Sequence, residues 1–386
     1  MTDMLPAMHL AFDDNSTPCE IRVRMAAGGR HVGTIFFRTD ATPLQPTADA
    51  LLCLGLLPAL EVLAPLRIDG SVDPSLLANA DAVQNLLCSW YPFYRRLPVS
   101  AVAAERAYPE GRGTALFYSG GIDSSYSLAA EHGRLDALIT IVDATAPGQR
   151  GPAAHRLIGA LGRAASAYDL EPIVVETNVR ALMQPFLAWM EFHGSAMAAI
   201  RHLLCNRFET VLIASSGDET AWFTPWGSHP ALDPLLGTRG ARIEHHGLVK
   251  RLDKIGAILT QPALMERLHI CNRDPERNCG RCAKCRFAIA CLSVLGAMDR
   301  APSFPRELEH APNHFHIQDD AIRSEYAYLR AAAAATGRNE GLVADIDRAL
   351  LAYEASKRRR IPFIPIDLGA RLKRAKHRAR YWRASG

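Results

Sequence analysis

Short apolar runs alternate with longer amphipathic stretches through the middle of the chain. The apolar runs, each of which we expect to form a strand, cover residues 114–118, 137–142, 172–176 and 210–215. The stretches between them have helical periodicity and cover residues 124–132, 153–168 and 182–205. Apolar strands that alternate with helices are typical of a parallel sheet with helices on both faces. The pattern therefore predicts an α/β fold for this part of the chain.

The first 108 residues have a different pattern. Strand-like runs at 20–25 and 31–38 flank a glycine turn, and helical stretches follow at 48–63 and 79–94. The segment 108–113 contains a proline and two glycines, and we interpret it as a linker. We therefore predict three parts: an N-terminal α+β module of unknown role at 1–108, the α/β domain at 109–300, and a C-terminal helical region with a basic tail at 301–386.

The sequence of 386 residues contains no stretch that we expect to cross a membrane. The longest apolar stretch, 51–66, is interrupted by Pro58, Glu61 and Pro65 and is too short to span a bilayer. The amino-terminal residues lack the basic and apolar regions of a secretory signal. These features predict a cytoplasmic protein.

A loop rich in serine and glycine follows the first strand of the α/β region and precedes a helix. In an open parallel sheet such a loop lies at the carboxyl edge, where ligands bind. Its glycines allow a close approach of the backbone, and the N–H groups at the helix start attract phosphate. Its carboxylate can hold Mg²⁺ or cap the helix. We predict a nucleotide phosphate site, with a plain tight turn as the alternative, at Ser119, Gly120, Gly121, Asp123, Ser124 and Ser125.

Four of the nine cysteines lie within one short segment, in the pattern C-x7-C-G-x-C-x2-C. They are Cys271, Cys279, Cys282 and Cys285. Four thiolates at this spacing suit tetrahedral Zn²⁺, and a closed shell of four sulfurs predicts a structural metal. An iron–sulfur cluster is the alternative. The odd number of cysteines and the scatter of the other five indicate a reducing compartment rather than a disulfide framework.

Polar residues at other strand ends can complete the nucleotide site. Asp143 ends the second strand of the α/β region, and Ser215 and Gly217 follow the fourth. We expect all three at the sheet edge that carries the serine–glycine loop, in contact with the nucleotide. A solvated turn is the alternative for Asp143.

Four further residues are candidates for substrate binding. His193 lies in a helical stretch, His229 and Asp233 lie in a loop dense in proline and aromatic residues, and Arg251 opens a helix before the cysteines. His229 and Asp233 could bind the substrate or position a nucleophile. Structural hydrogen bonding is the alternative for His229 and Asp233, and a surface helix kink is the alternative at His193.

The loop at Ser119 resembles the signature of the PP-loop, or N-type, ATP pyrophosphatases. It lacks the Gly-Lys-Ser/Thr ending of a Walker A motif. With the four cysteines it is similar to 7-cyano-7-deazaguanine synthase-like proteins, over residues 114 to about 300. The resemblance implies a HUP-type fold, ATP and Mg²⁺ as cofactors, a zinc knuckle at 271–285, and phosphate contact for Lys254. Asp123 and Lys254 would be the catalytic residues.

The implied activity is that of an AMP-forming, carbon–nitrogen bond-forming ligase. A substrate carboxylate would be adenylated with release of pyrophosphate, and ammonia or an amine would then give an amide or a nitrile. Residues 226–234 differ from the Tyr-Pro-Asp-Cys-Arg-like substrate motif of that family. The expected substrate is therefore a small-molecule or peptidic carboxylate rather than the deazaguanine itself.

Two other functions and several partners stay open at this point. A sulfur-inserting PP-loop enzyme acting on RNA or a small molecule is one alternative, and a non-catalytic nucleotide-binding scaffold is the other. Residues 351–386 carry 11 Lys or Arg against Glu354 and Asp367. Such a tail is either solvated or in contact with nucleic acid or an anionic membrane. We also expect a homo-oligomer.

Overall fold

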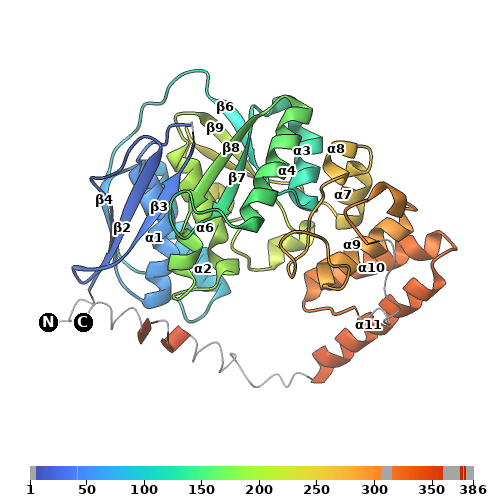
Figure 1. The fold of residues 1–386 in the computed structure, drawn as a ribbon. Helices are drawn as coiled ribbons and strands as arrows, with labels where there is room; N and C mark the ends of the chain where they lie inside the picture. The colour runs from blue at the N-terminus through green and yellow to red at the C-terminus, as the bar shows by residue number, and fades with distance from the viewer. Residues whose placement is uncertain (1–5, 41, 306–314, 360–373, 377, 380–386) are drawn as a thin grey trace.

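The computed structural model describes residues 6–40, 42–305, 315–359, 374–376 and 378–379 (Figure 1). It has an α/β fold built on one ten-stranded sheet, most of whose strand pairs are parallel. Within the described residues, no helix is both long and apolar enough to cross a membrane. The predicted cytoplasmic location stays a prediction.

The sheet consists of a parallel block, an antiparallel middle and a second parallel edge. The parallel block, in spatial order, contains β10 (Arg242–His246), β9 (Phe208–Ala214), β6 (Gly113–Phe117), β7 (Ala137–Asp143) and β8 (Glu171–Thr177). The antiparallel middle contains β3 (Arg30–Arg38), β2 (Glu20–Ala27) and β1 (Met8–Phe12). The second edge adds β4 (Leu66–Val72) and β5 (Val99–Ala103), which run parallel to β1.

Helices cover both faces of the parallel block, as the sequence pattern predicts. Ala115 and Phe117 on β6 pack into one buried cluster, whereas the intervening Leu116 and the following Tyr118 pack into another. The first cluster includes α1 (Ala48–Val62), α2 (Pro74–Trp90) and α6 (Trp189–Leu203). The second includes α3 (Ile122–Glu131), α4 (Pro152–Tyr168), α7 (Arg251–Ile258) and α9 (Ala283–Val294). Alternate side chains of a strand point to opposite faces, so both faces are buried.

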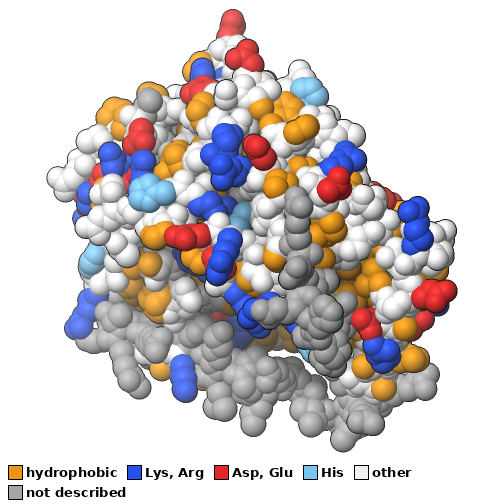
Figure 2. Space-filling view, turned by 45° about the vertical axis from the view of Figure 1, so that its right-hand side comes forward, with side chains coloured by type: hydrophobic (Ala, Val, Ile, Leu, Met, Phe, Trp, Pro, Cys, Tyr) orange, Lys and Arg blue, Asp and Glu red, His pale blue; other side chains and the backbone are white. Residues whose placement is uncertain are grey.

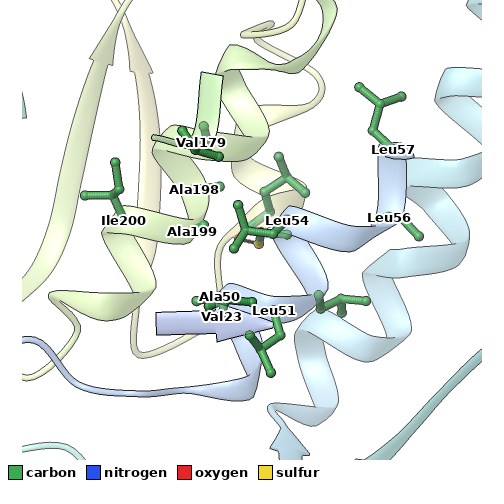
Figure 3. Packing of buried hydrophobic residues seen from close by; sticks show 14 of the residues in the cluster. Val23, Ala50, Leu51, Leu54, Leu56, Leu57, Val179, Ala198, Ala199 and Ile200 are labelled. Carbon is green, nitrogen blue, oxygen red and sulfur yellow. Dashed lines mark hydrogen bonds between the residues drawn. The ribbon is translucent and has the colours of Figure 1, made fainter. Parts of the chain in front are cut away.

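The N-terminal residues share a core with the parallel block. All 15 residues of α1 are buried, and Figure 3 shows Ala50, Leu51 and Leu54 of this helix beside Ala198 and Ala199 of α6. The strands are joined as well, since Phe37 on β3 pairs with Thr177 on β8. The division of the chain at residue 108 and the HUP classification stay predictions.

Three of the remaining helices pack with the cluster on the α3 face: α8 (Pro262–Met265), α10 (Asp320–Ala335) and α11 (Glu340–Arg359), of which the last two pack together beside α9. The short helix α5 (Val179–Met183) lies on the opposite face, where Val179 and Met183 belong to the first cluster. The predicted helix at 182–205 is divided into α5 and α6, because residues 184–187 form a turn and a bend before Ala188, the N-cap of α6. Most of the predicted basic tail lies outside the described residues. In Figure 2, basic and acidic side chains are interspersed over the face shown.

Candidate nucleotide site and metal centre

The serine–glycine loop connects β6 to α3 at the carboxyl edge of the parallel block. Gly120 has φ of +72°, and a Cβ there would lie 3.4 Å from the Ala160 side chain. An L side chain is disfavoured by that backbone conformation, so glycine is required for the turn. Gly121 is the N-cap of α3, and no side chain caps this helix. The first N–H groups of α3 are therefore available to an anionic ligand.

The loop serines are not equivalent. Ser119 is exposed at the tip of the loop, and its N–H donates to the Ser124 hydroxyl at 3.2 Å. Ser124 and Ser125 are buried, so their hydroxyls face the protein. Ser124 thus fixes the turn, while Ser119 offers a hydroxyl to a ligand.

Asp123 and Lys254, the two predicted catalytic residues, lie in direct contact. The Lys254 Nζ donates to Asp123 Oδ1 at 2.9 Å and to the backbone oxygen of Ser215 at 2.7 Å. The Lys254 side chain is 1% exposed and the Asp123 carboxylate is 28% exposed. The pair thus joins three elements, α3, α7 and the end of β9, and leaves part of the carboxylate open to a ligand.

The electrostatic surroundings keep Asp123 ionised. Burial alone would raise the pKa of this carboxyl group, but the positive charges of Lys254, Arg251 and Lys284 outweigh burial and lower the pKa. Lys284 was not predicted as a site residue. It lies between Cys282 and Cys285 of the knuckle, and its charge acts on Asp123 across the contact between these two parts of the chain. Three cations around one carboxylate leave a local excess of positive charge, which suits a polyphosphate.

The loop after β9 is shaped by its own polar groups. The Ser215 hydroxyl accepts from the Gly217 N–H at 3.3 Å and donates to the Gly217 carbonyl at 2.9 Å. The Arg251 guanidinium donates to the backbone oxygen of Ser216. Arg251, a predicted substrate residue, therefore belongs to the cluster around Asp123.

Asp143 lies at the carboxyl end of β7, the strand beside β6. Its side chain is 54% exposed and forms an ion pair with Arg180 at 3.3 Å. The structure therefore places Asp143 at the predicted edge, in an open position.

His193, His229 and Asp233 form a second cluster, on the α6 face. Asp233 is buried and accepts hydrogen bonds from the Ser228 hydroxyl at 2.6 Å, the His229 N–H at 3.2 Å and His245 Nδ1 at 2.8 Å. The His229 ring is buried 4.5 Å from the Trp90 ring, and burial lowers its pKa.

His193 Nδ1 lies 3.1 Å from the Met190 carbonyl, and its ring lies 6.0 Å from the Trp226 ring. The structure therefore gives these side chains internal contacts, away from the Asp123–Lys254 pair. His245 was missed because its strand, Arg-Ile-Glu-His-His, has a polar sequence.

The four predicted metal ligands converge. Their sulfur atoms all lie within 4.8 Å of one another, and those of Cys271 and Cys282 are 3.9 Å apart. A tetrahedral site with Zn–S bonds of about 2.3 Å needs sulfurs about 3.8 Å apart. Backbone N–H groups of Asp274 and Cys282 donate to the sulfurs of Cys271 and Cys279, each at 3.3 Å. The cluster can hold a structural metal such as zinc.

The cysteine knuckle, residues 271–285, adjoins the serine–glycine loop. The His269 N–H, just before the knuckle, donates to the Gly120 carbonyl at 3.1 Å. Arg156 on α4 donates through Nε to the Pro275 carbonyl at 2.7 Å. Gly280 adopts φ of +69° at the knuckle turn. The segment that carries the cysteines therefore contacts the loop and α4 rather than forming a separate unit.

Comparisons with known proteins add no family assignment. No protein-family model matches the sequence, and a search of curated proteins finds no significant match.

Proposed function

We propose that the protein adenylates a substrate carboxylate with ATP at the Ser119 loop and releases pyrophosphate. The observation that carries the proposal is the buried Lys254–Asp123 contact beside the uncapped start of α3. It combines fixed positive charge, free N–H groups and an accessible carboxylate oxygen in one place. These are the groups that a triphosphate and its counter-ion need.

The proposed first step is an in-line displacement at the α-phosphorus. A substrate carboxylate oxygen forms the new bond, and the bond from the α-phosphorus to the bridging oxygen of pyrophosphate breaks. Negative charge grows on the leaving pyrophosphate, where the α3 N–H groups, Lys254 and Arg251 would stabilise it. Mg²⁺ held by Asp123 and the phosphates would neutralise further charge. Asp123 also orients Lys254, whose buried position limits its freedom.

The proposed second step forms a carbon–nitrogen bond. Ammonia or an amine attacks the acyl carbon, AMP leaves, and a proton is lost from the nitrogen to give an amide. A second activation and loss of water would give a nitrile. We assign zinc to the four cysteines as a structural metal, because a closed sulfur shell offers no position for substrate.

The cysteines give less support to sulfur insertion than to the ligase reaction, because sulfur insertion needs a reactive cysteine thiolate. Cys205 is buried, and burial raises the pKa of its thiol, which disfavours the reactive thiolate. The clustered cysteines fit one metal site. We therefore retain the ligase proposal.

ATP turnover in purified protein tests the proposal. Products are resolved as AMP plus pyrophosphate or ADP plus phosphate, with a panel of carboxylic acids that includes 7-carboxy-7-deazaguanine. We expect AMP and pyrophosphate, and a loss of about 100-fold or more in Lys254→Met and Asp123→Asn. Lys357→Met and Asp253→Asn, which change exposed residues on α11 and α7, are matched controls.

Binding of a fluorescent ATP analogue gives a readout that needs no acceptor. Loss of binding in Lys254→Met, with the circular dichroism spectrum retained, would support the assignment of the loop. ADP as the product, or wild-type turnover in both site variants, would show that the proposed chemistry is wrong.

A further inference from the structure

We propose that the protein contains a guanidinium-binding cage, formed by Glu61, Glu191 and the turn Tyr91–Tyr94, whose ligand is Arg374 of its own C-terminal segment. Arg374 Nη1 donates to the Glu61 carboxylate and to the Tyr94 hydroxyl, the latter at 3.0 Å. Its Nη2 donates to Glu191 Oε1 at 3.0 Å. One guanidinium thus joins side chains from α1, from the turn after α2, and from α6. The inference is independent of the reaction proposed above.

Aromatic rings complete the cage. The Arg374 Cζ lies 3.6 Å from the centre of the Phe93 ring, 5.3 Å from that of Tyr94 and 5.7 Å from that of Tyr91. Phe93 and Tyr94 meet edge to face at 4.8 Å, which fixes their orientation. A guanidinium over a ring face gains cation–π attraction, and more so when water is excluded. The Arg374 side chain is only 13% exposed.

The cage explains why a carboxylate can be buried in α1. The Glu61 side chain is fully buried. Burial raises its pKa, while the Arg374 charge and the Tyr94 hydroxyl oppose that rise. A charged group in this position is unfavourable unless it is paired and hydrogen-bonded. Arg374 supplies both the charge and the hydrogen bond.

The geometry selects arginine over lysine. Two nitrogens of one planar group reach two carboxylates on different helices, while its face lies on Phe93. A lysine ammonium has no planar face and cannot reproduce this set of contacts. Arg378, four residues later, donates through Nε to the Glu61 carbonyl at 2.9 Å. This second contact lies in the last turn of α1, where positive charge is favourable.

The cage lies beside the predicted substrate loop. Glu191 is in the first turn of α6, and the neighbouring Met190 carbonyl accepts from the Gly227 N–H at 2.9 Å. Figure 1 shows the described C-terminal pieces, in red, below α1 and α2 and far from α11. Arg374 and Arg378 therefore attach this described part of the C-terminal segment to α1 and to the turn after α2. Two of the basic tail residues thereby have intramolecular partners.

Hydrogen exchange and ligand titration of the full chain test the cage. In Arg374→Ala we expect amide exchange at residues 88–95 and 374–379 to become at least about tenfold faster, because charged hydrogen bonds are lost. Arg374→Lys should behave like Arg374→Ala. Lys376→Ala removes an exposed charge from the same short segment and should leave exchange within about twofold of wild type.

Small-molecule rescue tests the selectivity. L-Argininamide should restore the slow exchange of residues 88–95 in Arg374→Ala, whereas L-lysinamide should not. In wild-type protein, excess L-argininamide should speed exchange at 374–379, which needs no variant to fold. Equal effects of both amides, or equal exchange in Arg374→Ala and Lys376→Ala, would overturn the proposal.

Discussion

Burial acts to raise the pKa of both Asp49 and Asp123, yet the net shifts of the two pKa values have opposite directions. Lys254 donates directly to Asp123, and the pKa of Asp123 is lowered. Asp49, in the first turn of α1, is 2% exposed and accepts from the Asp73 N–H at 2.7 Å. Burial raises the pKa of Asp49 from 3.8 to about 6, since one N–H donor does not replace its hydration. The direct contact with Lys254 therefore accounts for the lowered pKa of Asp123, whereas no cation among the described residues is in such contact with Asp49.

The raised pKa of Asp49 predicts a pH-dependent gain in stability for Asp49→Asn. A carboxyl group whose pKa is higher in the folded state destabilises the fold as pH rises from about 4 to about 6, and the cost is constant above that range. The amide keeps the acceptor for Asp73 and cannot ionise. We expect the free energy of unfolding at pH 8 to rise by up to about 3 kcal/mol, and little change at pH 4.

Urea unfolding at the two pH values measures the difference. Asp14→Asn, at an exposed turn, is the control and should change neither value appreciably. A cavity of about 300 Å³ beside Asp49 gives this carboxylate partial access to water. The rise in the free energy of unfolding at pH 8 should therefore be smaller than about 3 kcal/mol. An equal effect of Asp49→Asn at both pH values would contradict the assigned cause.

At the scale of elements, the cysteine knuckle and the serine–glycine loop form one unit. Cys282 is the N-cap of α9 and accepts from the Cys285 N–H at 3.5 Å, so metal binding and the start of α9 are linked. At the other end of the knuckle, the His269 N–H, just before Cys271, donates to the Gly120 carbonyl of the serine–glycine loop. Four thiolates without a cation repel one another, so loss of metal should open the knuckle and release the loop.

Metal removal should therefore weaken nucleotide binding at the loop, which we propose above, although the four cysteines are not among the residues proposed to contact the nucleotide. After chelation we expect one equivalent of zinc in solution and an increase in the Kd for ATP of about tenfold. Cys279→Ser should have the same effect, and Cys88→Ser, outside the knuckle, should have none. Unchanged ATP affinity after complete metal release would show that the knuckle does not support the loop.

At the scale of the whole molecule, local sequence patterns predicted most strands of the parallel block. They did not predict the strand β10 or the contacts that join this block to the N-terminal and C-terminal parts of the chain. Strands β6 to β9 were predictable because each is apolar and buried on both faces. The polar strand β10 was not, since its place depends on pairing with β9. The division at residue 108 was predicted from the change of pattern and from the proline and glycines at 108–113. The pairing of β3 with β8, through two residue pairs, joins the two halves of the sheet and leaves no signal in the local sequence. The cage around Arg374 joins residues 313 positions apart, which no local pattern reveals.

The junction between β3 and β8 gives a test of how far the two halves of the sheet fold together. Asn178 bridges it: its side chain accepts from the Phe36 N–H at 2.9 Å and donates to the Thr34 carbonyl at 3.0 Å. Asn178→Ala leaves both backbone groups without this partner, and we expect a loss of about 2 kcal/mol in the free energy of unfolding. Asn206→Ala, which removes an exposed hydrogen bond to Gln45, should cost less than about 0.5 kcal/mol.

The shape of the transition distinguishes one cooperative unit from two. Because α1 and α6 bury one core against strands of both halves, we expect Asn178→Ala to unfold in a single transition that is the same by fluorescence and by circular dichroism. The two probes would separate if residues 1–108 were an independent module, since the junction would then be its main attachment. Two transitions would therefore support the division at residue 108, and a single transition at lower stability would make the ten-stranded sheet one folding unit.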